Sequence, residues 1–330
     1  MSIKQALGVY KIQIRNYSDQ LQSIADQYHR PLLCVKLDAL WCHTYYGAPV
    51  SQYIGFGMYK MNRFERNQYV TMSRSARLEP VLNNAPREEK STIGDKQLFN
   101  KIYCKYIHRD WLYVLDSTDD EIRHFLSRHE VAIAKPTDGT RGHGVSKLDC
   151  GSALQEGQAF LDRAREQKLL LEEFVRQHPD LNAVNPSSLN TLRIATLRDK
   201  QGVVHVIGAS LRAGNAGSVV DNLHAGGVQY PVDVETGLII RSGMTHDGKK
   251  DILFHPSTHT KMIGFQIPNW EQIIASVKEA AAIPPHLRYI GWDVSVTEDG
   301  CEFIEANLGQ GANGMQQDGV GKYPVLKKYL

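Results

Sequence analysis

The stretch YIGWDVSVTEDGCEFIEAN, residues 289–307, says more about the fold than any other part of this sequence. It contains two strand-like runs, 289–297 and 301–307, with the turn-forming residues Glu298–Gly300 between them. A three-residue hairpin loop is favoured, in which a type I turn is followed by Gly300 in the left-handed region. We therefore predict an antiparallel hairpin.

The predicted register gathers acidic side chains on one face of this hairpin. Its pairs are Thr297 with Cys301, Ser295 with Phe303, and Asp293 with Glu305. Asn307 lies two residues beyond Glu305 and shares its face. Two carboxylates directly opposite each other repel, and a divalent cation would convert the repulsion into attraction. Since all three side chains offer oxygen, we predict Asp293, Glu305 and Asn307 as ligands of Mg²⁺ or Mn²⁺.

Two other interpretations of the hairpin stay open. The acidic residues could lie on a solvated face that holds no ligand. A two-residue loop would also shift the register by one, and would place Glu305 on the opposite face from Asp293.

A glycine-rich segment, KPTDGTRGHGV (135–145), follows an upstream strand-like run. Its glycines leave the backbone free to bend so that N–H groups can approach an anion, and Lys135 can meet a phosphate as a point charge. The segment is not a Walker A motif, because no G-K-[ST] follows, and its glycine order is not that of a dinucleotide fingerprint. Taken alone, such a segment is more commonly a plain surface turn.

Two arginines, Arg193 and Arg212, lie among apolar residues in the runs TLRIATL (191–197) and VVHVIGASLR (203–212), which read as paired strands. An arginine in a strand usually occupies a solvated outward position. Two of them on neighbouring strands could instead clamp a phosphate or a carboxylate.

The rest of the pattern is that of an α+β chain with much antiparallel pairing rather than a series of βαβ units. Residues 1–80 are predicted to be mostly helical, and the turn-rich residues 80–95 to be a linker or an exposed loop. Other helices are predicted over 119–129, 152–167 and 269–282, other strands over 131–136 and 169–175, and a hairpin over 230–240.

Composition narrows the class of protein. Hydrophobic residues make up 42% and charged residues 22% of the chain, and the net charge of +2 gives no pull toward nucleic acid or an anionic membrane. No apolar run approaches the roughly 20 residues that span a bilayer, and no secretory signal is visible. The five cysteines form no C-x-x-C pair, and neither H-E-x-x-H nor G-x-S-x-G occurs. We expect a cytoplasmic protein that is neither a zincin nor a serine hydrolase.

Together the segments resemble the ATP-grasp superfamily and, within it, the sugar-transfer associated ATP-grasp proteins. The matching segments, in the order of that family, are YYGAPVSQYIGFGMYKMNRFERNQYV (45–70), GDKQLFNKIY (94–103), AIAKPTDGTRGHGV (132–145), LLLEEFVRQHPDLNAVNPSSLNTLRIATL (169–197) and GWDVSVTEDGCEFIEANLGQG (291–311). The resemblance implies an ATP-grasp fold, in which two α+β lobes hold ATP between them, with a helical N-terminal segment. It divides the chain into residues 1–95 on the acceptor side, a small lobe over 96–175 with the glycine-rich loop, and a large lobe over 176–330 with the metal site.

The resemblance also implies roles for individual residues. Lys96 and Lys135 match the two lysines that hold the phosphates, and Arg193 and Arg212 match cations that steady a phosphoryl group or an acyl-phosphate. The loop that closes over the phosphates corresponds to Gly139, Thr140, Arg141, Gly142, His143 and Gly144. The hinge whose backbone meets adenine corresponds to Glu172, Glu173, Phe174 and Val175, with Asp180 as the ribose-binding acid. The family's metal ligands correspond to Asp293, Glu305 and Asn307, the trio that the hairpin register groups independently.

The implied function is that of an ATP-dependent, ADP-forming ligase. Transfer of the γ-phosphate would activate a carboxylate, and an amine or a similar nucleophile would attack the acyl-phosphate. The expected cofactors are ATP and Mg²⁺ (or Mn²⁺), and the expected partners are a small-molecule carboxylate and an amine or a sugar-linked substrate, without nucleic acid. The family name suggests polysaccharide biosynthesis, by association only. Two alternatives stay open, a kinase acting on a sugar or another small alcohol, and a non-catalytic ATP-binding protein.

Overall fold

A computed structural model describes residues 17–137, 144–214, 227–245, 251–309 and 313–330 of the protein. Its helices are α2 (Leu32–Trp41), α3 (Val50–Gly55), α4 (Arg63–Asn67), α5 (Met72–Leu82), α6 (Arg87–Gly94), α7 (Lys96–Ile102), α8 (Asp119–Arg128), α9 (Cys150–Glu156), α10 (Gln158–Glu166), α11 (Pro179–Val184), α12 (Trp270–Ala282) and α13 (Tyr323–Lys328). Its strands are β1 (Trp111–Tyr113), β2 (Val131–Pro136), β3 (Ser146–Asp149), β4 (Leu169–Glu173), β5 (Thr191–Arg198), β6 (Val204–Ala213), β7 (Val228–Val232), β8 (Met244–Thr245), β9 (Tyr289–Thr297) and β10 (Gly300–Asn307). Short helical turns are η1 (Cys42–Tyr46), η2 (Met58–Lys60), η3 (Cys104–Tyr106) and η5 (Gly314–Gln316).

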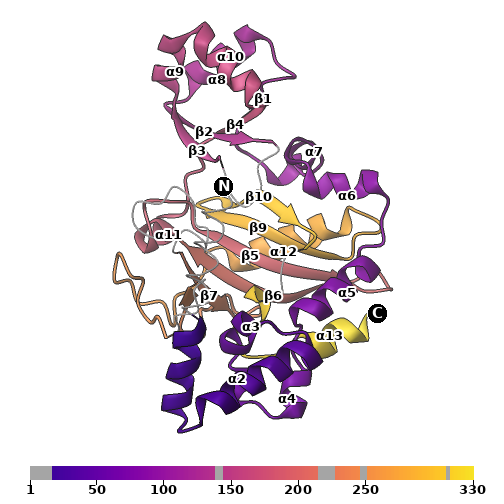
Figure 1. Ribbon diagram of the computed structural model, residues 1–330. Coiled ribbons are helices and arrows are strands. Elements are labelled where there is room, and N and C mark those ends of the chain that lie inside the picture. The colour runs from indigo at the N-terminus through magenta and orange to yellow at the C-terminus, as the bar shows by residue number, and fades with distance from the viewer. Residues whose placement is uncertain (1–16, 138–143, 215–226, 246–250, 310–312) are drawn as a thin grey trace.

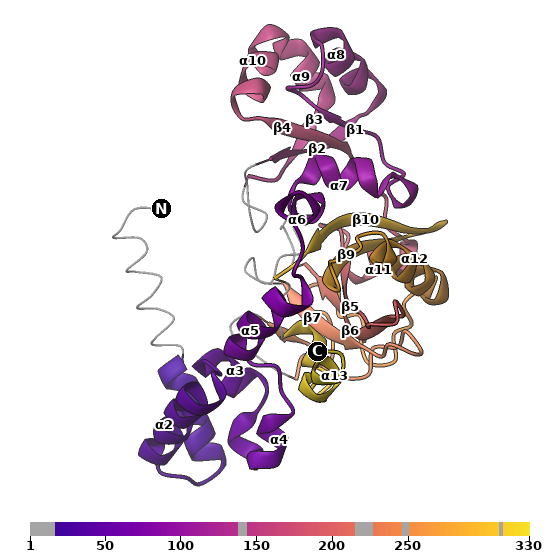
Figure 2. The same ribbon diagram turned by 90° about the vertical axis from the view of Figure 1, so that its right-hand side faces the viewer.

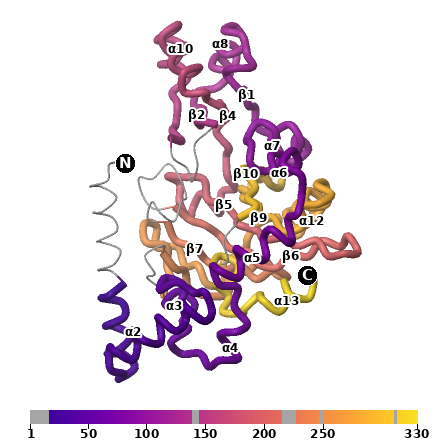
Figure 3. Tube along the Cα trace, turned by 45° about the vertical axis from the view of Figure 1, so that its right-hand side comes forward, coloured from indigo at the N-terminus to yellow at the C-terminus, as the bar shows by residue number. Residues whose placement is uncertain are grey.

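The described residues are arranged in three parts, which follow one another in space. Helices α2–α4 lie at one end, a six-stranded sheet occupies the middle, and a four-stranded sheet with helices α8–α10 lies at the other end (Figure 1). The same order is visible along the Cα trace in Figure 3. The chain is therefore α+β with N-terminal helices, as the sequence predicts.

The larger sheet has the strand order β10-β9-β5-β6-β7-β8, and every pair in it is antiparallel. Alternate residues of its strands point to opposite faces. On one face Leu192, Ile194, Trp292 and Val294 belong to a core that also contains Val277 of α12. This alternation leaves the intervening polar residues of β5, β6, β9 and β10 on the other face.

That second face changes character along its length. A bulge between Ala195 and Thr196 shifts the register of β5 against β6. Beyond the bulge, Leu197 joins a second buried cluster with Leu78 and Leu82 of α5. One end of the face is therefore apolar and covered by α5, whereas the end that carries Arg193 is polar.

The smaller sheet has the order β1-β4-β2-β3, again with antiparallel pairs. Its residues Ala132, Ala134 and Leu171 pack in one buried cluster with side chains of α8, α9 and α10. Figure 2 shows these three helices on the side of the sheet turned away from the larger sheet. By alternation, Leu170 and Glu172 of β4 point toward the larger sheet.

The N-terminal helices have a core of their own. Val35, Tyr53 and Met58 are fully buried in it. Arg66 donates to both carboxylate oxygens of Asp38, at 2.7 and 2.8 Å. This bidentate pair lies within the N-terminal helical part, apart from the strands of both sheets.

Several predicted elements are confirmed and two are wrong. The helix predicted over 119–129 is confirmed as α8, which begins with a capping box in which Thr118 and Glu121 bond each other reciprocally. The predicted helix over 152–167 is divided in two at Gly157, whose φ of 60° breaks the helix. The predicted loop over 80–95 is mostly helical, since α5 continues to Leu82 and α6 begins directly after Pro86. Acidic residues in the first turn of α6 favour that helix electrostatically.

Among the residues that the structure describes, no helix is both long enough and apolar enough to cross a bilayer.

Candidate functional site

The β9–β10 hairpin has a different loop from the one predicted, yet it brings the same two carboxylates together. Thr297 pairs with Gly300, so the loop has two residues, and the predicted pairs Thr297 with Cys301 and Ser295 with Phe303 are wrong. A bulge between Phe303 and Glu305 then shifts the register by one and pairs Glu305 with Asp293. The predicted pairing of these two acids is confirmed, although it arises from the bulge and not from the loop.

The neighbouring strands add two cations to this pair of acids. The register of β5 against β9 sets Arg193 directly beside Asp293. Its Nη2 donates to Asp293 Oδ2 at 2.8 Å, and its Nε donates to Oδ1. Arg212 on β6 donates from Nη1 to Asp293 Oδ2 at 3.2 Å. We call Arg193, Arg212, Asp293, Glu305 and Asn307 the carboxylate cluster.

Charge in the carboxylate cluster is unevenly compensated. Burial alone would raise the pKa of Asp293, but the guanidinium groups of Arg193 and Arg212 lower that pKa to about 2. Partial withdrawal from water and the Asp293 carboxylate raise the pKa of Glu305. Glu305 is the more exposed of the two acids, whereas Asp293 is 3% exposed. Among the described residues, Glu305 is therefore less strongly compensated by cations than Asp293 is.

The cluster fits a small divalent cation. Asn307 donates from Nδ2 to Glu305 Oε1 at 3.2 Å, and its Nδ2 stands 3.5 Å from Asp293 Oδ2. Rotation of this amide about its Cβ–Cγ bond presents Oδ1 to the same space, which completes an all-oxygen donor set. Arg212 Nε is buried and has no hydrogen-bond partner among the described residues, so it can still donate to an anion.

The predicted phosphate lysines lie on the smaller-sheet side. Lys135 is on β2, and its ammonium pairs with the Glu172 carboxylate on the adjacent strand β4. Lys96, in the first turn of α7, donates from Nζ to the Pro136 carbonyl at 2.7 Å. The two lysines therefore both lie beside the end of β2, where the glycine-rich segment begins.

Two further buried charges, which sequence reasoning missed, extend this arrangement. Arg109 donates from Nη2 to Glu172 Oε1 at 2.7 Å and from Nη1 to Glu302 Oε1 at 2.5 Å. The side chains of Arg109 and Glu172 are 3% exposed, and that of Glu302 is 4% exposed. We call Lys135, Glu172, Arg109 and Glu302 the intersheet charge chain, since it runs from β2 and β4 to β10. An arginine flanked by His108 and Asp110 offers no pattern that would reveal this role.

Most of the predicted adenine hinge has its side chains engaged within the protein. Glu173 accepts a hydrogen bond from the Asp110 amide at 3.0 Å, and its own amide donates to the Asp110 carbonyl at 2.8 Å. The Phe174 ring lies beneath Lys147, with 4.8 Å from Nζ to the ring centroid. Val175 is half-buried, and Asp180 is exposed in the first turn of α11.

The glycine-rich loop is described only in part. Gly139, Thr140, Arg141, Gly142 and His143 lie outside the described residues. Gly144 has a φ of 80°, and a Cβ at that position would stand 2.7 Å from Pro136 Cγ. Both the backbone conformation and the close approach to Pro136 therefore require glycine there.

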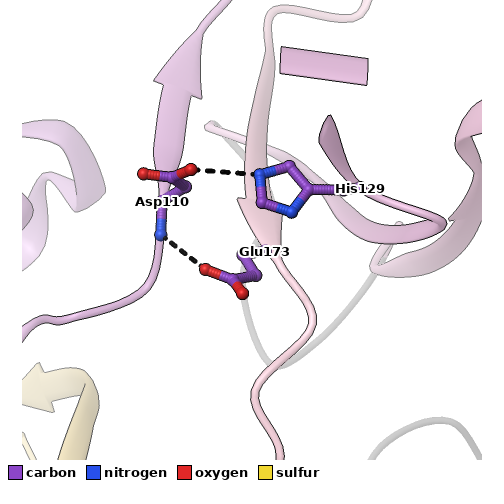
Figure 4. Close-up of side chains that lie close together, drawn as sticks. All are labelled: Asp110, His129 and Glu173. Atoms are coloured by element: carbon purple, nitrogen blue, oxygen red, sulfur yellow. Dashed lines mark hydrogen bonds and ion pairs between the residues drawn. The ribbon is translucent and has the colours of Figure 1, made fainter. Parts of the chain in front are cut away.

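A second group of metal-type ligands surrounds Asp110, as Figure 4 shows. His129 Nε2 stands 3.1 Å from Asp110 Oδ2, and Glu173 accepts from the Asp110 amide. The Arg128 guanidinium pairs with the same Asp110 oxygen. Because a protein cation already neutralises this carboxylate, the group is explained as an ion pair that joins β1 to α8 and β4.

The sequence matches the profile of one protein family. The profile described as sugar-transfer associated ATP-grasp matches residues 73–328. The chain belongs to that family. This ATP-grasp protein therefore has the fold that the resemblance implied, with the carboxylate cluster on its larger sheet.

Among solved structures, the ATP-grasp ligase PsnB in complex with Mg and ADP is 15% identical, with a TM-score of 0.45, over 81% of this chain and 70% of that one. The biotin carboxylase domain of Hydrogenobacter thermophilus 2-oxoglutarate carboxylase is 15% identical, with a TM-score of 0.41, over 66% and 40% of the two chains. D-alanyl-alanine synthetase A from Vibrio cholerae is 10% identical, with a TM-score of 0.41, over 67% and 56%. No curated protein matches the sequence.

Proposed function

We propose that this protein is an ATP-dependent ligase that joins a carboxylate to an amine or a similar nucleophile, with release of ADP and phosphate. The observation that carries this proposal is the carboxylate cluster, in which Asp293, Glu305 and Asn307 lie beside two arginines on the polar end of one sheet face. Oxygen ligands next to paired cations suit a metal-bound polyphosphate and the anion that receives its phosphoryl group.

Each group has a distinct task in the proposed reaction. Asp293, Glu305 and Asn307 would hold Mg²⁺ or Mn²⁺, which when bound would neutralise phosphate oxygens. Lys135 and Lys96 would hold the phosphates from the side of the smaller sheet. Arg193 and Arg212, next to the metal ligands, would bind the substrate carboxylate and then the acyl-phosphate as planar donors.

The proposed chemistry needs positioning and charge compensation rather than a covalent nucleophile. An oxygen of the substrate carboxylate attacks the γ-phosphorus, the bond to the β,γ-bridging oxygen breaks, and ADP leaves. The amine then attacks the acyl carbon, the bond from that carbon to the phosphate oxygen breaks, and phosphate leaves with the amide as product. The five residues of the carboxylate cluster supply cations and metal ligands for both steps, and neither step requires a serine or cysteine.

The substrates we propose are a small-molecule carboxylate and an amine or a sugar-linked acceptor. The family description, which refers to sugar transfer, supports a role in polysaccharide biosynthesis.

Release of products from ATP tests the proposal. The protein is incubated with ATP, Mg²⁺ and a panel of carboxylic acids, with and without amines, and ADP and phosphate are measured. Hydroxylamine is added in a parallel series, because it converts an acyl-phosphate to a hydroxamate. Acid-dependent release of ADP with hydroxamate formation supports the ligase. Release of AMP and pyrophosphate contradicts it, and a stable phosphorylated alcohol would identify a kinase instead. Nucleotide binding without turnover across the panel would favour the non-catalytic alternative.

A further inference from the structure

The intersheet charge chain occupies the place where the polypeptide crosses between the two sheets. The polypeptide enters the smaller sheet at β1 and leaves it at the end of β4. These two crossing points lie side by side, because Trp111 of β1 pairs with Glu172 of β4. Arg109 lies just before the first crossing, and Glu172 lies at the second. A hydrogen bond from Glu173 N to Asp110 O, 2.8 Å long, also joins the crossings.

Arg109 connects both crossings to the larger sheet. Its Nη1 donates to Glu302 Oε1 at 2.5 Å and to the Phe303 carbonyl at 2.7 Å. These two residues precede the bulge that sets the position of Glu305. Any rotation of the smaller sheet about its crossings would therefore stretch the contacts of Arg109 with β10.

Arg109 also changes the charge that Lys135 presents. Glu172 is the carboxylate that pairs with the Lys135 ammonium, and Arg109 binds the other oxygen of the same carboxylate. Among the four residues of the intersheet charge chain, Lys135 has the most exposed side chain, at 16%. Because Arg109 shares the negative charge of Glu172, Lys135 keeps an excess of positive charge toward any anion that approaches from solvent.

We propose that Arg109 is a positioning residue for nucleotide binding. Through Glu172 it sets the position and effective charge of Lys135, and through Glu302 it fixes the smaller sheet against the strand that carries Glu305. Arg109 touches neither nucleotide nor metal. This inference rests on the proposed ATP site and adds to it a residue that no sequence pattern or family comparison assigns.

The test removes Arg109 alone, or together with one of the carboxylates that it contacts, and compares the effects on nucleotide binding and on thermal stability. The probe is adenylyl imidodiphosphate with Mg²⁺, titrated calorimetrically into the full chain, and the thermal midpoint of each variant is recorded in parallel. Arg109→Met should raise the Kd about tenfold, since Lys135 is then the one cation that contacts Glu172 among the described residues, beside the neutral Asn100 amide. Arg109→Met with Glu172→Gln removes the carboxylate that competes for Lys135, and should bring the Kd back to within about threefold of the wild type.

A second double variant separates this role from plain destabilisation. In Arg109→Met with Glu302→Gln, Glu172 keeps Lys135 as its cationic partner, so this variant should regain thermal stability, but its Kd should stay raised. In the first double variant Glu302 keeps its contacts with the His108 amide and ring, and in the second Glu172 keeps Lys135, so both carry the test even where Arg109→Met fails to fold. Arg66→Met, which breaks the bidentate pair with Asp38 in the N-terminal helices, is the matched control. It should lower the thermal midpoint and leave the Kd unchanged.

The possible results distinguish failure of this inference from failure of the proposed function on which it rests. An Arg109→Met protein that folds and binds with the wild-type Kd overturns the inference alone, as does equal recovery of the Kd in both double variants. Absence of nucleotide binding by the wild type overturns the proposed function and the inference together.

Discussion

The carboxylate cluster and the intersheet charge chain both combine acids with cations, but the cluster lies on the larger sheet alone, whereas the intersheet charge chain joins the two sheets. They also differ in how fully each acid is compensated. In the intersheet chain, Glu172 contacts both Lys135 and Arg109, and Glu302 contacts Arg109 and the His108 amide. In the carboxylate cluster, Glu305 accepts from the Asn307 amide and lies opposite another acid. We infer that the fully paired acids Glu172 and Glu302 hold the two sheets together, while the incompletely paired Glu305 is available to bind a cation.

The largest effect is expected for Asp293→Asn in the carboxylate cluster. The change removes a proposed metal ligand and the carboxylate that both arginines contact, so kcat/KM should fall by roughly 10²- to 10³-fold. Turnover is measured as ADP release at saturating Mg²⁺. Asp299→Asn, at the exposed turn of the same hairpin, is the control and should match the wild type. An Asp293→Asn protein that retains its turnover would show that the cluster has no role in catalysis.

Lys135→Met changes the one member of the intersheet chain that is proposed to contact ATP. Glu172 keeps Arg109 as a partner, so the protein should fold, and the Kd for Mg²⁺ with ATP should rise by about 10- to 100-fold. Lys101→Met is the matched control, because Lys101 pairs with Asp116 at 3.8 Å on the exposed surface. Equal affinities of the two variants would argue that Lys135 serves only to compensate Glu172.

Glu172→Gln tests whether the intersheet chain is structural through the pH dependence of stability. Burial would raise the pKa of Glu172, but Arg109 and Lys135 lower it from 4.5 to about 2. Because the folded-state pKa is depressed, the charged carboxylate stabilises the fold above pH 4.5, and this contribution is lost as the pH falls toward 2. At pH 7 the variant should be less stable by about 1–3 kcal/mol.

Urea unfolding at a series of pH values measures this effect. The difference in unfolding free energy between wild type and Glu172→Gln should shrink as the pH falls below 4.5. Glu298→Gln, at an exposed turn position, should unfold like the wild type throughout. A difference that stays constant with pH would mean that the Glu172 charge contributes nothing to the fold.

The smallest effect is expected for His129→Gln beside Asp110. Arg128 already pairs with the Asp110 carboxylate, so this group resembles the intersheet chain rather than the carboxylate cluster. The thermal midpoint should fall by no more than corresponds to about 1 kcal/mol, and Mn²⁺ titration should be unchanged. Loss of a tight Mn²⁺ site in this variant would show that the cation binds beside Asp110 and not at the carboxylate cluster.

The sequence predicts which acids lie together on the β9–β10 hairpin, but it does not predict the register that brings them together. Alternation along β9 and β10 is readable, and it groups Asp293, Glu305 and Asn307. The bulge after Phe303 cannot be predicted, because the residues around it carry no turn signal. In the folded protein Phe303 packs against Trp292 and Tyr106. The correct pair therefore came from two errors of register that cancel.

Arg109 and Glu302 show a different limit of sequence reasoning. They lie 193 residues apart and their contact depends on how the smaller sheet docks on the larger one. Hydrophobic periodicity predicts which strands form but not which buried charges face each other across two sheets. Sequence reasoning also misses the helix over residues 87–94, in which Glu89 accepts hydrogen bonds from the distant His286 backbone and ring.

The central claim is that the incompletely paired acids on β9 and β10 take a divalent cation together with ATP. The most direct measurement is a crystal structure with Mn²⁺ and adenylyl imidodiphosphate, in which anomalous scattering locates the metal. We expect the anomalous peak between Asp293, Glu305 and Asn307, with phosphate oxygens completing the shell and Lys135 facing the phosphates. A peak at Asp110, His129 and Glu173 instead, or nucleotide bound away from the carboxylate cluster, would contradict the account.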